Sequence, residues 1–87
     1  MANINFIVPI KVGSPFERAN KILDLVFGHG NHYELNDRFS VFNSLGNNCG
    51  KIYLPLNVSL EPLVAAQHTL GFNVQAEVRQ NKIVLHY

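Results

Sequence analysis

The segment from Ser14 to Gly28 contains a complete set of helix signals, and it constrains the fold more than any other part of the chain. Ser14 can cap the helix N-terminus, Pro15 suits the first helical position, and Glu17 stands where it closes a capping box. Apolar residues follow at spacings of three and four: Phe16, Ala19, Ile22, Leu23, Val26 and Phe27. Gly28 follows the last of these residues, where a left-handed C-terminal cap is expected. The segment predicts an amphipathic helix that needs an apolar surface to cover.

Strand-like segments flank this helix on both sides. Residues 4–10 ("INFIVPI") are nearly apolar on both faces, which predicts a central strand. Residues 38–44 and 51–56 alternate between apolar and polar positions and are joined by the turn residues "LGNNCG", which predicts a hairpin. Pro55 cannot donate a ladder hydrogen bond, so we expect its strand at a sheet edge or a bulge.

The last third of the chain predicts a second helix and a second hairpin. Ser59 can cap the helix, Pro62 is tolerated in its first turn, and Gly71 can end it after Leu70. Two alternating strands follow, joined by a short turn around Gln80 and Asn81. Their inward residues are expected to be Val74, Ala76, Val78, Ile83, Leu85 and Tyr87.

The resulting order is β-α-β-β-α-β-β, in a single α+β domain that spans residues 1–87. A chain of 87 residues has no room for a second core. The most economical packing is one mostly antiparallel sheet with both helices on one face, a ferredoxin-like (α/β-plait) arrangement with an added last strand. The right-handed crossover rule supports it. A different α+β meander is the alternative.

Charge and cysteine content bear on partner and compartment. The net charge is +1 and the Lys and Arg residues stand singly, which does not favour tight, sequence-independent binding to nucleic acid. Cys49, the only cysteine, can form no internal disulfide, which favours a reducing compartment. The N-terminus does not read as a signal peptide, and no apolar stretch approaches the roughly 20 residues of a membrane span. We expect a protein of the cytoplasm, in a bacterial or host cell.

The sheet face turned away from the helices is the first candidate binding surface. The predicted alternation places apolar residues from four strands on it, with Gln75 and Glu77 near them. If these residues touch, such a patch marks a partner site or a self-association surface. If they are scattered, they are ordinary surface residues. The binding residues expected on this face are Ile7, Phe42, Tyr53, Val84, Arg79 and His86.

This face resembles that of RNA-recognition domains, in which bases stack on aromatic residues of an uncovered sheet. The segment "GKIYLPLN" offers Lys51 and Tyr53 where that family has a basic and an aromatic residue, but leucines and a proline stand at the other positions. Phe6, in the first strand, is expected in the core. The resemblance lies in topology more than in motif, and it implies RNA binding as an alternative function without assigning the family.

Two polar loops form the second candidate surface. Their residues are His29, Asn31, His32 and Glu34 after the first helix, and Asn47 and Asn48 in the first hairpin turn. His29 and His32 could ligate zinc, but a structural site needs four ligands. Glu34, Cys49 and His68 stand at no recognised spacing from them. The sequence therefore predicts contact loops, with no metal and no cofactor.

No catalytic motif is present, so the sequence first predicts a small non-enzymatic binding protein that inhibits a protein partner through an interface. Phage-encoded proteins that block host defence, anti-CRISPR proteins among them, are often small domains of this kind. RNA binding on the sheet face is the alternative, and a small ribonuclease toxin using Glu77, Arg79 and His86 is the second alternative. A homodimer is also expected, because the strand ending at Tyr87 would leave an unpaired sheet edge.

Overall fold

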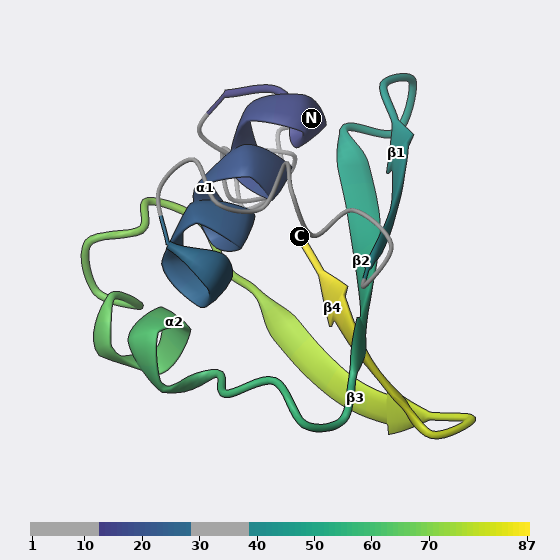
Figure 1. Ribbon diagram of the computed structural model, residues 1–87. Helices are drawn as coiled ribbons and strands as arrows, with labels where there is room; N and C mark the ends of the chain where they lie inside the picture. The colour runs from purple at the N-terminus through teal and green to yellow at the C-terminus, as the bar shows by residue number, and fades with distance from the viewer. Residues whose placement is uncertain (1–12, 29–38) are drawn as a thin grey trace, which may run out of the picture.

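The computed structural model describes residues 13–28 and 39–87, which form an open antiparallel sheet with two helices (Figure 1). In chain order the elements are α1 (Pro15–Phe27), β1 (Ser40–Ser44), β2 (Cys49–Pro55), α2 (Glu61–Ala65), β3 (Gln75–Arg79) and β4 (Lys82–His86). The predicted α+β class is confirmed. The expected first strand at residues 4–10, including Ile7, lies outside the described residues.

The strand order is β1-β2-β4-β3, and all neighbouring strands are antiparallel. Both predicted hairpins are present, and the second turns at Gln80 and Asn81 with φ of 53° and 64°. The expectation that Pro55 places its strand at an edge is wrong, because β2 lies between β1 and β4. Pro55 is tolerated because it is the last residue of β2 and pairs only with Lys82, after the β1 ladder has ended. The expected edge at the last strand is also wrong, since β4 lies between β2 and β3.

Helix α1 begins with the predicted capping box. The Ser14 hydroxyl accepts the Glu17 N–H at 3.2 Å, and the Glu17 carboxylate accepts the Ser14 N–H at 2.8 Å. At the other end the Gly28 N–H donates to the Asp24 carbonyl at 2.9 Å, with φ 92° and ψ 143°. Phe16 was expected to face inward but is 63% exposed. It lies in the first turn, to one side of the buried stripe that runs from Pro15 through Arg18 and Ala19.

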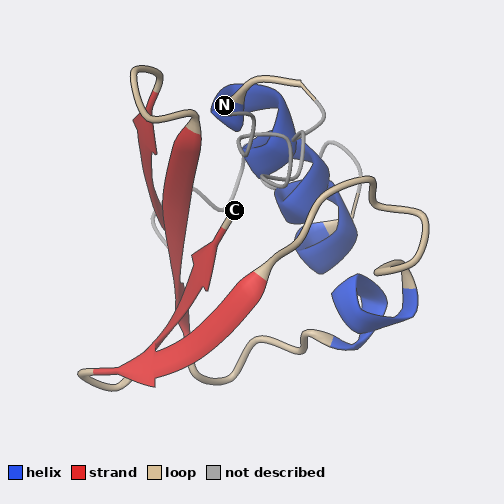
Figure 2. Cartoon of the chain, turned by 180° about the vertical axis from the view of Figure 1, so that it is seen from behind, coloured by secondary structure: helices blue, strands red, loops and turns tan. Residues whose placement is uncertain are grey.

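The core lies between the helices and one face of the sheet, and both helices are on the same side (Figure 2). Its buried apolar members are Ala19, Ile22 and Leu23 of α1, Ile52 and Leu54 of β2, Ile83 and Leu85 of β4, and Leu63, Leu70 and Tyr87. The two central strands supply the sheet's share of this set. Val78 was also expected inside but is 70% exposed, because β3 is an outer strand of the described sheet.

Helix α2 is much shorter than predicted. It ends at Ala65, and Leu60 rather than Ser59 is its N-cap, although the Ser59 hydroxyl accepts the Glu61 N–H at 3.3 Å. Beyond Ala65 the chain tightens into turns, and the Thr69 hydroxyl donates to the Ala66 carbonyl at 3.1 Å. A threonine side chain that bonds nearby backbone in this way competes with helix continuation.

Arg18 connects α1 to the β1–β2 turn, a role that no local pattern in the sequence predicts. It is only 1% exposed. One guanidinium nitrogen donates to the Gly13 carbonyl at 2.8 Å, and another donates to the backbone carbonyl of Asn48 at 2.7 Å. The guanidinium carbon also lies 5.9 Å from the centre of the Phe72 ring. These contacts fix the start of the helix over one end of the sheet.

Tyr87 closes the same end of the core against Gly50. Its hydroxyl donates to the Asn43 side-chain oxygen at 2.6 Å, and its backbone exchanges hydrogen bonds of 3.0 and 3.1 Å with Gly50. Burial raises the pKa of Tyr87 to about 12. A Cβ at Gly50 would overlap the Asn43 oxygen and the Tyr87 ring, so only glycine fits there.

Candidate binding surface on the open sheet face

The face of the sheet opposite the helices is called the open face here. The strand register aligns its residues in rows across the four strands. One row is Phe42, Lys51, His86 and Gln75, the next is Ser40, Tyr53, Val84 and Glu77, and the third is Pro55, Lys82 and Arg79. The register therefore brings most of the predicted sheet-face residues onto one surface.

Phe42 and Tyr53 form an aromatic pair on this face. Their ring centroids are 5.6 Å apart and the rings are perpendicular, an edge-to-face contact between diagonal positions on neighbouring strands. Phe42 nevertheless remains 60% exposed. Two predicted members of the patch are thus in contact and accessible, whereas Ile7 lies outside the described residues.

Val84 was predicted to be a binding residue of the open face, and this prediction is wrong. It is only 1% exposed. Its register partners are Tyr53 on one side and Glu77 on the other, and these larger side chains stand directly beside it on the same face. Val84 therefore packs between its neighbours on the open face and is not accessible to a partner.

Glu77, His86 and Arg79 form a polar cluster beside the aromatic pair. The Glu77 Oε2 and His86 Nε2 atoms are 2.5 Å apart, and Arg79 donates to Glu77 Oε1 at 3.2 Å. The hydrogen bond with His86 is the main reason that the pKa of Glu77 is lowered, and Arg79 adds to the effect. Glu77 is therefore a carboxylate at neutral pH and can only accept, so His86 donates through Nε2.

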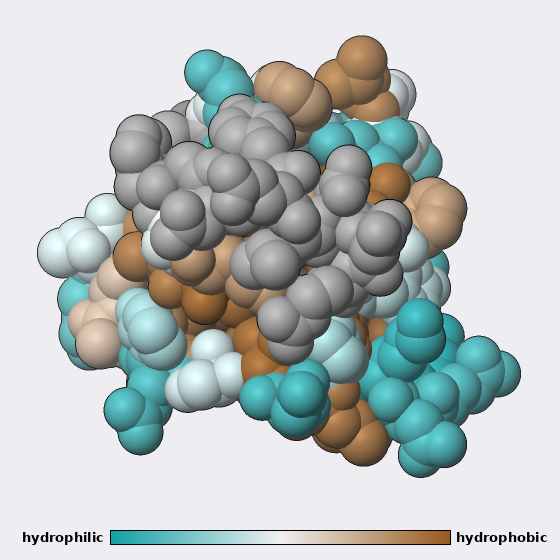
Figure 3. Space-filling model, viewed as in Figure 1, coloured by the Kyte–Doolittle hydropathy of each residue, from teal (hydrophilic) through white to brown (hydrophobic). Residues whose placement is uncertain are grey.

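The open face also gathers positive charge. Three of the five Lys and Arg residues in the described segments stand on it, namely Lys51, Arg79 and Lys82, all exposed. Of the four described acidic residues, only Glu77 lies on this face, while Glu17, Asp24 and Glu61 belong to the helices. Cations that stand singly in the sequence are thus concentrated by the strand register. Figure 3 shows the hydrophilic surface at the far end of the β3–β4 hairpin, where the chain reads Arg79, Gln80, Asn81 and Lys82.

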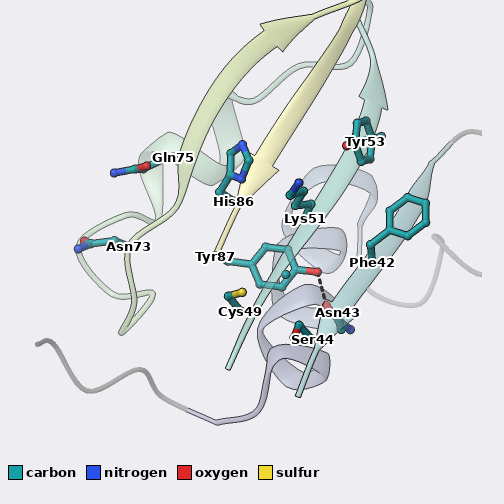
Figure 4. A pocket seen from close by; sticks show the side chains of 11 residues that line it. Phe42, Asn43, Ser44, Cys49, Lys51, Tyr53, Asn73, Gln75, His86 and Tyr87 are labelled. Carbon is teal, nitrogen blue, oxygen red and sulfur yellow. Dashed lines mark hydrogen bonds between the residues drawn. The ribbon is translucent and has the colours of Figure 1, made fainter. Parts of the chain in front are cut away.

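A hollow of about 690 Å³ lies over the open face. Figure 4 shows Phe42 and Tyr53 on one side of it and Asn73 and Gln75 on the other. Lys51 and His86 stand between these two pairs on the central strands. The hollow therefore offers ring faces, the Lys51 ammonium, the His86 imidazole and side-chain amides to one ligand.

The predicted contact loops are only partly covered by the structure. His29, Asn31, His32 and Glu34 lie outside the described residues. Asn47 and Asn48 are in the β1–β2 turn and are exposed. Asn48 has φ of 52°, and both its backbone carbonyl and its side-chain oxygen accept from Arg18. Asn48 thus helps to hold the fold, which reduces what it can offer to a partner.

Lys51, Lys82 and Asn73 were not among the predicted site residues. The alternation already placed Lys51 on the same side as Tyr53, and Lys82 on the same side as His86. This signal was available in the sequence. Alternation could not predict Asn73, because this residue precedes β3. It lines the hollow because the segment that leads into β3 passes beside it.

Two kinds of site are absent from residues 13–28 and 39–87. These residues contain no group of three or more His, Cys, Asp and Glu placed to hold a metal ion. No helix among them has both the length and the apolar character needed to cross a membrane.

Comparison with known proteins gives no relative for this chain. No family model, curated protein or solved structure matches it. The function is therefore inferred from the open face, with its aromatic pair, its cations and the hollow above them.

Proposed function

We propose that this protein is a binding module that holds single-stranded RNA on the open face of its sheet. The observation that carries the proposal is the Phe42–Tyr53 pair, with Phe42 exposed and Tyr53 half-buried, on the same face as three exposed cations. Bases of a single strand stack on aromatic rings, and their phosphates need positive charge nearby. The two requirements meet on this face.

The dimensions of the surface suit a nucleotide. Ligand pockets typically measure about 300–1,000 Å³, and the hollow of about 690 Å³ falls in that range. A base stacked on Phe42 would have its ribose and phosphate over Lys51, the register partner of Phe42 on β2. Asn73 and Gln75 offer amide groups to base edges at the other side. A duplex cannot use this arrangement because its bases are stacked and paired.

Among residues 13–28 and 39–87, the one acidic residue of the open face does not oppose an anionic ligand. Glu77 is engaged by His86 at 2.5 Å and by Arg79 at 3.2 Å. Its negative charge is therefore largely compensated within the protein. Lys51 and Lys82 form no ion pair with an acidic residue among the described residues, so phosphates can approach them.

Salt dependence of binding tests this proposal. Fluorescence anisotropy of a labelled single-stranded RNA would be measured over a range of salt concentrations for the wild type, Lys51→Ala and Lys21→Ala. Each phosphate contact on a single strand contributes about 0.7 to the slope of log affinity against log salt, so Lys51→Ala should lower the slope by about that amount. Lys21 lies on α1, on the helix side of the sheet, so Lys21→Ala should leave this slope unchanged. Failure of the wild type to bind any single strand would refute the proposal.

A protein partner is the second candidate, and exposed apolar residues of the β1–β2 hairpin favour it. Phe42 is 60% exposed and Leu45, at the hairpin tip, is 74% exposed. A protein that binds over both residues would make this chain an inhibitor of that protein, as the sequence predicts. The same prediction includes a phage-encoded, anti-CRISPR-like inhibitor that acts in the cytoplasm. In that case Leu45→Asp should abolish capture of the partner. RNA binding should be unaffected by Leu45→Asp, because Leu45 lies in the turn beyond the rows of the open face.

Self-association is a separate expectation about partners. An unpaired edge is expected from the sequence at the last strand, but β4 is interior and the outer strands of the described sheet are β1 and β3. A homodimer would then form through one of these outer strands. Light scattering at two protein concentrations tests it, with a constant monomer mass as the contrary outcome.

A further inference from the structure

We propose further that the open face cleaves the RNA that it holds, with His86 acting as general base on a ribose 2′-hydroxyl. The inference rests on the proposed function, because the substrate must first lie across the hollow. It adds a chemical activity to that function. The observation behind it is the Glu77–His86 pair at the edge of an accessible hollow.

The hydrogen bond to Glu77 determines which nitrogen of His86 can act as a base. Glu77 carries its negative charge at neutral pH and accepts a proton from His86 Nε2 at 2.5 Å. In a neutral imidazole only one ring nitrogen bears hydrogen, so the lone pair is on Nδ1. Arg79 holds the other carboxylate oxygen at 3.2 Å and limits its movement. Glu77 is therefore a positioning residue that fixes the tautomer and orientation of His86.

His86 is accessible from the hollow and lies at a suitable distance from the aromatic pair. Its side chain is 34% exposed. Phe42, Lys51 and His86 are consecutive partners in one row, so two strand spacings of about 4.8 Å separate the backbones of Phe42 and His86. Side chains at the two ends of this row, about 10 Å apart at the backbone, can therefore contact one nucleotide and its 3′-phosphate. A base stacked on Phe42 therefore brings its sugar and phosphate to Lys51 and His86, as Figure 4 allows the reader to follow.

The reaction requires only groups already on this face. Nδ1 of His86 removes the proton from the 2′-hydroxyl while the 2′-oxygen attacks the adjacent phosphorus. The bond from the 2′-oxygen to phosphorus forms, the bond from phosphorus to the 5′-oxygen breaks, and the Lys51 ammonium gives a proton to the departing 5′-oxygen. The products are a strand with a 2′,3′-cyclic phosphate and a strand with a 5′-hydroxyl. Exchange of protons with water then restores His86 and Lys51.

The experiment measures binding and cleavage of the same labelled RNA in the presence of a metal chelator. Mass spectrometry would identify the 2′,3′-cyclic phosphate product. A general base contributes about 10²- to 10⁴-fold to a rate, so His86→Ala should lower the cleavage rate by at least 100-fold. Its RNA affinity should change by only a few-fold. His68→Ala is the matched control, because His68 is an exposed histidine in the turns after α2 and should leave the rate unchanged.

Two further comparisons are needed. One tests whether Glu77 positions His86 or only stabilises the fold, and the other tests whether cleavage requires the 2′-hydroxyl of the strand. Glu77→Gln should lower the cleavage rate without weakening RNA binding, while the variant stays folded at the assay temperature. A strand with deoxyribose at every position should bind but stay intact, because it lacks the attacking hydroxyl.

The outcomes distinguish this inference from the function on which it rests. RNA that is bound by the wild type but stays intact overturns the cleavage inference and leaves the binding proposal standing. Cleavage that persists at the wild-type rate in His86→Ala also overturns it, since the activity then belongs to another group or a contaminant. Absence of RNA binding by the folded wild type overturns both.

Discussion

The two faces of strand β4 differ in a way that explains much of this molecule. Ile83 and Leu85 point toward the helices and are at most 8% exposed, whereas His86 on the other face remains accessible. Val84 shares the face of His86 yet is 1% exposed, because β4 is central and larger side chains flank it there. Alternation along a strand thus decides which face a residue takes, while the side chains that flank it on the neighbouring strands decide its exposure.

The largest expected effect is a difference in unfolding free energy between a variant on the helix-covered face of the sheet and a variant on the open face. Leu85→Ala removes a side chain that is 0% exposed and should cost about 2–5 kcal/mol of unfolding free energy. Phe42→Ala, on the open face, should cost no more than about 1.5 kcal/mol, because this exposed ring loses only its edge-to-face contact with Tyr53. Urea denaturation of both variants provides the measurement. Similar losses in the two would show that Phe42 belongs to the core.

A medium effect on stability is expected at Gly50, which packs against Asn43 and Tyr87 at one end of the core. Gly50→Ala places a methyl group against the Asn43 oxygen and the Tyr87 ring, and overpacking of this kind costs about 1–3 kcal/mol. Gly46→Ala is the control, because a Cβ there meets no atom within 4 Å. Thermal melts of the two variants should differ clearly. Equal melting temperatures would contradict the tight packing at Gly50.

The smallest expected effect is the pH dependence of the stability that Glu77 contributes in the polar cluster of the open face. Because the pKa of Glu77 is lowered in the folded protein, its contribution to stability is present above the usual Glu value of about 4.3 and is lost as pH falls through the lower folded value. The difference in melting temperature between the wild type and Glu77→Gln should therefore shrink below about pH 4. A difference that stays constant between pH 7 and pH 3 would show that the pairing with His86 does not persist in solution.

Local signals were enough to predict the first helix and both hairpins. The capping box of Ser14 and Glu17 involves residues three apart, and the turn at Gln80 and Asn81 joins adjacent strands, so neighbouring residues determine both. The end of α2 was missed because the Thr69 hydroxyl, which bonds the Ala66 carbonyl, offers the chain a turn in place of further helix. The sequence does not show which of these two local structures prevails.

Strand order could not be derived from the sequence, because it depends on how the two hairpins pair. The β2–β4 ladder joins residues about 30 positions apart and places Pro55 and Tyr87 away from the edges where they were expected. The same ladder determines the candidate site. Alternation alone predicted that Phe42, Tyr53 and His86 share a face, but only the ladder buries Val84 and places Lys51 between Phe42 and His86.

The central claim is that the open face binds RNA and the helix side does not, and two phenylalanines test it most directly. Phe42 on the open face is 60% exposed and Phe16 on α1 is 63% exposed, so their replacement by Ala removes nearly the same accessible side chain. Stacking of one base contributes about 1–3 kcal/mol, so Phe42→Ala should weaken binding of a single-stranded RNA by about 5- to 150-fold. Phe16→Ala should leave the dissociation constant unchanged. Equal dissociation constants for the two variants would contradict the claim.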